Sequence, residues 1–181
     1  MQSPKEKTQT KRGASTKTAE HERFLALIDQ YQRMLLKISW AYTHSSHDRD
    51  DLFQEMVGRL WAAFGNYDRK RTFSTWMYRV ALNVAIDFRR SRQRQQMETR
   101  RLDDAPDPPS RQDETRQEQL QELRELLEEL DEADRAILLL SLEGNSYREI
   151  ADIIGISESN VGTRLSRLKN SLRQSVQASE F

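Results

Sequence analysis

Short polar side chains and basic side chains are concentrated in residues 157–169. Together with one glycine, they occupy Ser157, Ser159, Asn160, Gly162, Thr163, Arg164, Arg167 and Lys169. Hydroxyl and amide groups can hydrogen-bond to the edges of nucleic-acid bases, whereas arginine and lysine pair with phosphates. A glycine among them permits close approach to a base or to the nucleic-acid backbone. The chemistry that this segment predicts is recognition of a nucleic acid.

The surrounding residues predict the two helices that would present this segment. Ser146 and Glu149 form the S-x-x-E pattern of a capping box, which begins a helix. Gly155 suits the left-handed conformation of a tight turn, and Ser157 can cap the helix that follows. Four apolar residues would bury that second helix against the first: Val161, Leu165, Leu168 and Leu172. This order is the spacing of a DNA-binding helix-turn-helix, and the alternative is an ordinary helical hairpin with a solvated basic face.

Aromatic and basic residues alternate in a second segment, residues 67–94. The members nearest its start are Tyr67, Arg69, Lys70, Arg71, Trp76 and Arg79, and four arginines follow at 89, 90, 92 and 94. Aromatic rings beside basic groups suit the unstacked bases of single-stranded nucleic acid. Packing in the core is the alternative for Trp76, whereas the loop at 67–71 favours nucleic acid.

Acidic residues cluster at Asp48, Asp50, Asp51 and Glu55, with two histidines nearby. Such a cluster could suggest a metal site, but acidic residues are also favoured at the start of a helix by its dipole. We expect a helix start or a partner-binding surface here, with no metal ion and no cofactor. No nucleophile–base pair and no phosphate-binding loop is recognisable, so the chain is not expected to be an enzyme.

Apolar periodicity predicts an all-α fold of two small helical domains joined by a flexible linker. Residues 1–20 are polar and basic and predict a disordered tail. Residues 21–94 predict three amphipathic helices, and residues 120–176 predict the domain that contains the helix-turn-helix. Between them, residues 95–119 contain three prolines and no apolar periodicity, which is typical of a linker.

Composition limits the environment of the chain. There is no cysteine, which fits a reducing cytoplasm, and no apolar run approaches the roughly 20 residues that would span a bilayer. The net charge is zero, but the first 90 residues carry +6 and the rest −6. Because local patches decide where phosphate binds, this distribution is compatible with DNA binding.

The two segments together resemble a known family. Residues 50–57, 59–61 and 73–83 resemble region 2 of the extracytoplasmic-function sigma factors, and residues 130–172 resemble region 4. This resemblance implies a subunit that binds the core of bacterial RNA polymerase and directs it to promoters. It also implies an anti-sigma partner that holds the protein inactive.

The resemblance also implies roles for individual residues. Docking on the coiled coil of the largest polymerase subunit would involve Asp51, Leu52, Gln54, Glu55 and Arg59. Capture of single-stranded bases of the −10 element, with contacts to duplex phosphates upstream, would involve Tyr67, Arg69, Lys70, Arg71, Trp76, Arg79, Asn83, Arg89 and Arg90. The helix-turn-helix residues at 157–169 would read the −35 element in the duplex.

Two other interpretations remain open from the residues alone. A stand-alone helix-turn-helix regulator would use the first domain for dimerisation or ligand binding and would bind duplex DNA tightly by itself. A helical adaptor without DNA contact would leave the basic face at 164–173 unexplained.

Overall fold

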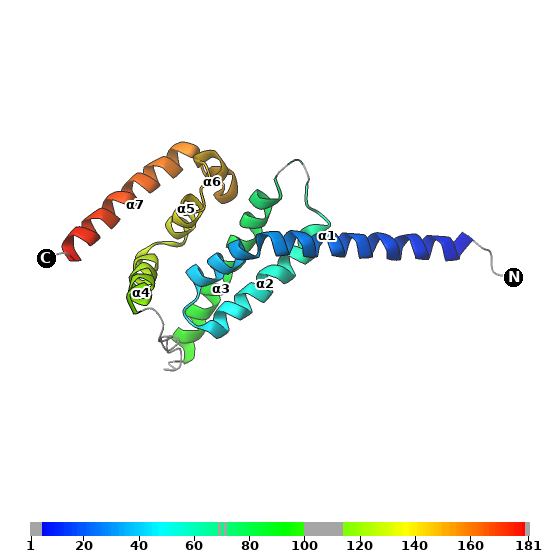
Figure 1. Cartoon of the computed structure of the whole chain (residues 1–181), viewed down its shortest axis with the longest axis horizontal. Helices are drawn as coiled ribbons and strands as arrows, with labels where there is room; N and C mark the ends of the chain where they lie inside the picture. Colours follow the sequence, from blue (N-terminus) through cyan, green and yellow to red (C-terminus); the bar gives the residue numbers. More distant parts are fainter. Residues whose placement is uncertain (1–4, 69, 71, 100–113, 180–181) are drawn as a thin grey trace.

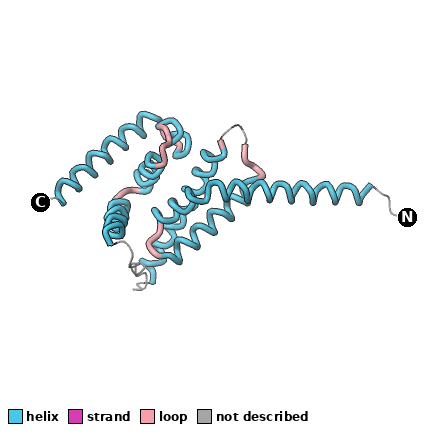
Figure 2. Tube along the Cα trace, in the orientation of Figure 1, coloured by secondary structure: helices cyan, strands magenta, loops and turns pink. Residues whose placement is uncertain are grey.

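The computed structural model describes residues 5–68, 70, 72–99 and 114–179 of the chain. Over these ranges every regular element is a helix, and the helices form two groups (Figures 1 and 2). The all-α architecture of two helical domains that the sequence predicts is confirmed.

Three helices form the N-terminal domain: α1 (Lys5–Tyr42), α2 (Ser46–Phe64) and α3 (Phe73–Thr99). Each of them packs against the other two, because each carries apolar residues at steps of three and four along one face. Leu35 of α1, Leu52 of α2 and Met77 of α3 are fully buried in the resulting core. The opposite faces of α2 and α3 are thereby turned outward.

The first helix begins earlier than the sequence predicts. α1 starts at Lys5, whereas the periodic pattern starts near His21 and a disordered tail is expected over residues 1–20. The early turns of α1 extend away from the two domains (Figure 1). Once a helix is nucleated, each further residue adds a hydrogen bond at little cost. A helix can therefore continue past the residues that anchor it, without an apolar face to bury.

Four helices form the C-terminal domain: α4 (Glu114–Glu129), α5 (Glu132–Leu142), α6 (Tyr147–Ile154) and α7 (Glu158–Ser179). Helices α5, α6 and α7 pack against one another, with Ile137, Ile150 and Leu165 fully buried between them. Of the linker expected at 95–119, α3 and α4 take up both ends, and residues 100–113 lie outside the described part of the chain.

The two domains touch. Helix α3 packs against α6, and the last turns of α1 lie against α5. Polar contacts link Lys37, Tyr42 and Arg90 of the N-terminal domain to Glu132 and Glu143 of the C-terminal domain. The buried Arg135 of α5 also donates to the Ala41 carbonyl of α1. We call these contacts the interdomain seam.

Candidate nucleic-acid interface

Helix α6 begins with the capping box that the sequence predicts. The backbone N–H of Glu149 donates to Ser146 Oγ at 3.3 Å, and the backbone N–H of Ser146 donates to Glu149 Oε2 at 2.8 Å. Hydrogen bonds from the Ser146 side chain and backbone lower the pKa of Glu149, because they stabilise its ionised form. This cap fixes the residue at which α6 starts.

Gly155 makes the turn between α6 and α7. Its φ of 85° lies in the left-handed region, and its N–H donates to the Ala151 carbonyl at 2.8 Å. A side chain in that conformation would be strained, so glycine suits the position. Beyond the turn, the fully buried Val161 packs the start of α7 into the domain. The predicted helix-turn-helix is confirmed as a structural unit.

The outward face of α7, together with Ser157 just before it, carries most of the residues predicted to read duplex DNA. The exposed members are Ser157, Ser159, Asn160, Thr163, Arg167 and Lys169. The Ser157 hydroxyl accepts from the Asn160 N–H at 3.3 Å, and the Thr163 hydroxyl donates to the Ser159 carbonyl at 2.9 Å. These bonds hold the Ser157 and Thr163 side chains close to the backbone, so this part of the face is polar and has no protruding side chain from either residue.

Gly162 lies beneath an aromatic ring that the pattern of polar and basic residues does not predict at this site. A Cβ built on Gly162 would lie 3.4 Å from a ring carbon of Tyr147, the first residue of α6. Tyr147 is nevertheless 46% exposed. Gly162 therefore gives room to Tyr147 and brings a phenol ring to the edge of the exposed face. The position of Tyr147 directly after the capping Ser146 is the one sequence signal for it.

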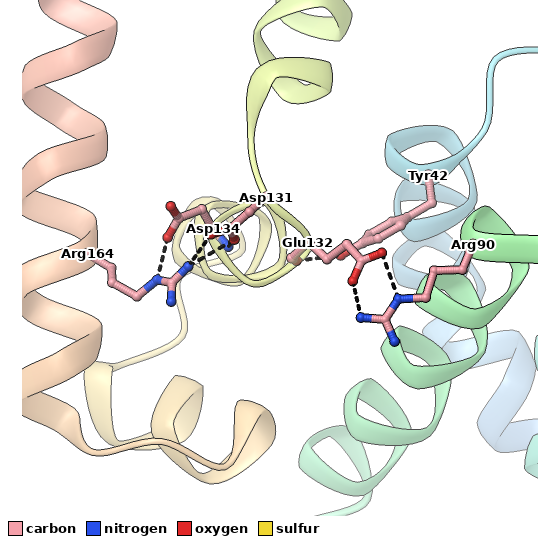
Figure 3. A network of polar contacts seen from close by, with 6 residues as sticks. All are labelled: Tyr42, Arg90, Asp131, Glu132, Asp134 and Arg164. Carbon is pink, nitrogen blue, oxygen red and sulfur yellow. Dashed lines mark hydrogen bonds and ion pairs between the residues drawn. The ribbon is translucent and has the colours of Figure 1, made fainter. Parts of the chain in front are cut away.

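Arg164 points back into its own domain. Its Nε lies 2.5 Å from Asp134 Oδ1, and its Nη2 lies 2.7 Å from Asp131 Oδ2 (Figure 3). The hydrogen bond to Asp134 raises the pKa of Arg164. The side chain is only 26% exposed. In this structure Arg164 joins α7 to the start of α5, whereas the exposed Arg167 carries no such ion pair among the described contacts.

Aromatic rings cluster where α3 begins. The ring of Tyr67 lies 5.1 Å from that of Trp76 and 5.5 Å from that of Phe73, measured between centroids. Tyr67 and Trp76 are half-buried, so part of each side chain packs against its neighbours and part remains accessible to solvent. The exposed Lys70 follows, with its N–H bonded to Asp68 Oδ1 at 3.0 Å. Arg69 and Arg71, predicted for the same site, lie outside the described residues.

Helix α3 continues this surface along one stripe. Arg79, Asn83 and Arg90 are exposed and follow at steps of four and seven, which places them on the same side of the helix. Arg89 is half-buried and lies beside this stripe. Arg90 pairs with Glu132 of α5, which raises the pKa of the guanidinium. The structure thus brings the described members of the predicted −10 set to one end and one side of α3.

Helix α2 presents the residues predicted to dock on polymerase, with one correction. Gln54, Glu55 and Arg59 are exposed, and Asp51 is half-buried. Leu52 is fully buried in the domain core, so it supports the helix from beneath and contributes nothing to the outer surface. Its place in the predicted docking set is corrected on that ground, since consecutive residues of a helix point about 100° apart and Leu52 faces the core.

A cavity of about 460 Å³ opens between α2 and α3 beside this surface. Its lining includes Glu55 and Phe88, and the guanidinium of Arg92 lies 5.3 Å from the centre of the Phe88 ring. Arg92 also pairs with the buried Asp48 at 2.5 Å. Two residues of the predicted acidic cluster, Asp48 and Asp51, therefore form ion pairs with Arg92 of α3.

Two further features concern the described residues only. In that part of the chain, no group of three histidine or acidic side chains is arranged to hold a metal ion. Among the described helices, none combines the length and the apolar character needed to cross a membrane.

Family models match both domains. The model described as "Sigma-70 region 2" matches residues 27–95, and the model described as "Sigma-70, region 4" matches residues 120–172. The first match covers α2 and most of α3, and the second covers the helix-turn-helix. The two models belong to the same family and follow each other in the order that the sequence predicts.

Curated relatives agree with these matches. An ECF RNA polymerase sigma factor, SigW of Bacillus subtilis, is 30% identical over 77 residues, which are 42% of this chain and 41% of that protein. The sigma factor NccH of Alcaligenes xylosoxydans xylosoxydans is 29% identical over 164 residues, which are 87% of this chain and 88% of that protein. The ECF sigma factor SigG of Mycobacterium tuberculosis is 34% identical over 76 residues, which are 42% of this chain and 20% of that protein. The matched segments thus span less than half the length of SigW and of SigG.

Two solved structures share the fold. CnrH, solved in complex with the cytosolic domain of CnrY, aligns with a TM-score of 0.66 at 23% identity over 87% of this chain and 90% of that one. The sigma factor RpoE of Bartonella quintana, solved with the anti-sigma factor NepR, aligns with a TM-score of 0.71 at 19% identity over 86% and 98%. The helix-turn-helix lies within the region 4 match, and the aromatic and basic start of α3 lies within the region 2 match. The chain therefore belongs to the sigma-70 family, in its extracytoplasmic-function group.

Proposed function

We propose that this chain is a sigma factor that binds the core of bacterial RNA polymerase and directs it to promoters in the cytoplasm. The observation that carries the proposal is that one chain has two separate surfaces whose side chains are suited to nucleic acid. One is a helix-turn-helix with a polar outer face, and the other is the aromatic and basic start of α3. The protein acts by binding and positioning, and the polymerase performs the chemistry.

The outer face of α7 is the proposed reader of the −35 element. A helix of this width fits the major groove of B-form DNA, where amide and hydroxyl groups can bond to base edges. Asn160 is the exposed amide of this face, and Arg167 and Lys169 supply charges for bases or phosphates. Tyr147 extends the same face at its edge.

The start of α3 is the proposed site of −10 capture. Extruding a base from a duplex costs a few kcal/mol, which stacking and hydrogen bonding in a pocket can offset. The accessible parts of the Tyr67 and Trp76 rings offer surface for stacking, and Asn83 offers hydrogen bonds one turn beyond Arg79. Arg89 and Arg90, farther along α3, are placed to contact duplex phosphates upstream of the melted bases.

The exposed face of α2 is the proposed docking surface for the coiled coil of the largest polymerase subunit. Gln54, Glu55 and Arg59 form its outer row, with Arg59 3.9 Å from Glu55. A polar, mixed-charge row of this kind suits recognition of a charged helical partner. We also propose an anti-sigma partner, because the sigma factor RpoE, which shares this fold, was solved in complex with the anti-sigma factor NepR.

Reconstituted transcription tests this function. The purified chain is added to bacterial core polymerase that lacks other sigma factors, and genomic fragments of the source bacterium serve as templates. We expect transcripts that begin at discrete positions, with two shared sequence elements upstream of the aligned starts. A chain that neither co-elutes with core polymerase nor supports initiation on any fragment contradicts the proposal.

A matched pair of variants links the result to the assigned surface. Arg167→Ala removes an exposed arginine of α7, and Arg33→Ala removes an exposed arginine of α1 that lies outside both proposed DNA surfaces. We expect only Arg167→Ala to lower initiation at promoters that depend on the upstream element. Equal loss in both variants would show that the effect comes from total charge alone.

A further inference from the structure

The early turns of α1 carry a local excess of positive charge. Over residues 1–17, Glu6 is the one acidic residue, against five basic residues: Lys5, Lys7, Lys11, Arg12 and Lys17. The chain as a whole has zero net charge, so this excess is confined to one segment. Lysine and arginine concentrated in one segment attract nucleic-acid phosphates whatever the total charge of the protein. We call residues 5–17 the basic extension; the surfaces proposed above for DNA lie on α3 and around α7 and leave it without a partner.

Aromatic rings fix the root of the basic extension to the N-terminal domain. The His21 and Phe24 rings of α1 lie 5.1 and 5.0 Å from the Trp61 ring of α2, measured between centroids. Phe24 is buried, and its ring lies 5.2 Å from that of Phe64, the last residue of α2. Because α1 is one continuous helix, these contacts determine where the basic extension leaves the domain.

This root lies at the same end of the domain as the proposed base-capture site. The Phe64 ring that contacts Phe24 also lies 6.4 Å from the ring of Trp76. One helix earlier in the chain, the Tyr31 ring of α1 lies 5.5 Å from the ring of Phe73, the first residue of α3. From there α1 runs outward past the end of α2 (Figure 1). The basic extension therefore starts beside the site where bases are proposed to be captured.

The direction of α3 shows on which side of that site the extension lies. The start of α3 is near Tyr31, whereas Phe88 and Arg89 line a small pocket together with Tyr42, the last residue of α1. The two helices thus run in opposite directions along the domain. In the proposed function, Arg89 and the neighbouring Arg90 contact the duplex upstream of the captured bases. The basic extension lies beyond the opposite end of α3, where the DNA continues downstream.

The length of the basic extension limits how far along the DNA it can reach. At ~1.5 Å per residue, the helix from Lys5 to His21 would span about 24 Å. Phosphates follow one another along a strand at ~3.4 Å, so this length corresponds to about seven nucleotides. Contacts made by the extension should therefore be limited to a short stretch next to the captured bases.

We propose that the basic extension binds the phosphates of the melted promoter strand directly downstream of the captured −10 bases. The inference rests on the proposed function, which supplies the path of the DNA. Binding through phosphates is independent of sequence and is weakened by salt. Because the extension and the capture site hold the same strand, each raises the effective concentration of DNA at the other. The extension thereby favours the melted state over the duplex.

Forked promoter templates test this contact with the holoenzyme. A promoter identified by reconstituted transcription is prepared with a single non-template strand that either ends at the captured bases or continues for about ten nucleotides. Lys11→Gln combined with Arg12→Gln removes two charges and retains good helix formers. We expect the double variant to bind the longer template about two- to tenfold more weakly than the unaltered chain and the shorter template equally well. The salt slope on the longer template should fall by about 1.4, at about 0.7 for each phosphate contact.

Two control variants separate the position of the charges from their number and from the residue type. Arg33→Glu on α1 changes the net charge by the same two units outside the proposed DNA surfaces, and it should leave the preference for the longer template unchanged. Lys11→Arg combined with Arg12→Lys exchanges the two residues and keeps both charges. This exchanged chain should bind the longer template as the unaltered chain does.

Cleavage from a tethered iron chelate locates the extension on the DNA. Because the chain has no cysteine, Gln9→Cys provides one attachment point within the basic extension, and the labelled chain is then combined with core polymerase. Hydroxyl radicals released there should cut the non-template strand within about seven nucleotides downstream of the captured bases. Cutting only upstream of those bases, or no cutting by a labelled holoenzyme that still initiates, contradicts the proposal.

The binding comparison gives an equally clear negative result. The proposal is overturned if Lys11→Gln with Arg12→Gln binds the longer template as tightly as the unaltered chain, or loses affinity equally on both templates. Either result with normal initiation removes the downstream contact alone and leaves the proposed function standing. A chain that initiates on no genomic fragment overturns both.

Discussion

At the scale of single residues, Arg164 and Arg167 illustrate how position on one helix separates structural and binding roles. Both are predicted from the sequence to contact DNA. In the structure Arg164 is paired with Asp131 and Asp134, whereas Arg167 is exposed on the outer face of α7. The ion pairs with Asp131 and Asp134 lie within the C-terminal domain, so they do not involve the interdomain seam.

The two arginines should therefore respond differently to replacement by alanine. Arg164→Ala should lower the free energy of unfolding by about 1–2 kcal/mol, because it leaves two neighbouring carboxylates without their partner. Arg167→Ala should change stability by less than about 0.5 kcal/mol and instead weaken duplex binding, with a salt slope reduced by about one. Urea unfolding and DNA titrations at several salt concentrations measure both effects. A stable Arg164→Ala protein with a DNA defect would return Arg164 to the reading surface.

Asn83 provides a prediction for the melting step. It is exposed on α3 one turn beyond Arg79, next to the proposed base-capture site. Asn83→Ala should lower the formation of open complexes more than the formation of closed complexes, because its amide contacts bases only after they leave the duplex. Permanganate reactivity of unpaired thymines reports the first quantity, and gel retardation reports the second. Gln93→Ala, an exposed amide farther along α3, is the control, and equal effects of Asn83→Ala on both steps would refute a melting role.

At the scale of elements, the helix-turn-helix depends on its capping box and on one left-handed glycine. Both features are local, since the residues that make them lie within four positions of each other in the chain. Local hydrogen-bond patterns of this kind leave a direct trace in the sequence. The start of α6 and the turn at Gly155 could be predicted for that reason.

The capping box should make a measurable and pH-dependent contribution. Ser146→Ala should lower the free energy of unfolding by about 1 kcal/mol at neutral pH. The pKa of Glu149 is lowered in the folded chain, so its stabilisation is present above its ordinary value of 4.5 and is lost as the pH falls further. The difference between Ser146→Ala and the unaltered chain should therefore shrink in acid. Ser166→Ala, an exposed serine of α7, should show no such difference, and a pH-independent defect in Ser146→Ala would argue against the cap.

Other elements could not be predicted from local pattern. Arg164 is separated from Asp131 by 33 residues and Arg90 from Glu132 by 42, and neither pairing leaves a periodic trace in the sequence. Tyr147 covers Gly162 only because two helices cross at that point. The early start of α1 lacks an apolar signal altogether. The sequence predicts helices well where apolar periodicity or a local cap marks them, whereas contacts that depend on how helices meet require the folded structure.

At the scale of the whole molecule, two tyrosines lie where the domains meet. Tyr42 donates to the Glu132 carbonyl, and Tyr78 of α3 hydrogen-bonds with Asn145 at the loop before α6. Burial raises the pKa of Tyr42 strongly and that of Tyr78 to about 12, with a further contribution at Tyr78 from the nearby Glu143. The folded molecule therefore favours the neutral phenols.

The free energy of unfolding should fall in alkaline solution for this reason. A raised pKa in the folded chain means that the stabilisation is fully present below the ordinary value of 10 and is lost as the pH rises toward the folded value of about 12. Tyr78→Phe, which cannot ionise, should lose less stability over that interval, although it begins less stable because its bond to Asn145 is absent. Unfolding curves between neutral and alkaline pH measure both slopes. Parallel curves for the two proteins would show that Tyr78 is not the titrating group.

The long first helix affects the hydrodynamic behaviour of this protein. At ~1.5 Å per residue, the 38 residues of α1 would span about 57 Å, and the early turns project beyond the two domains. Such an extension increases friction without adding much mass, so a chain of 21.3 kDa should elute early from a gel-filtration column. An apparent dimer in that measurement would then be a single elongated molecule, which sedimentation equilibrium, being independent of shape, would reveal by its true mass.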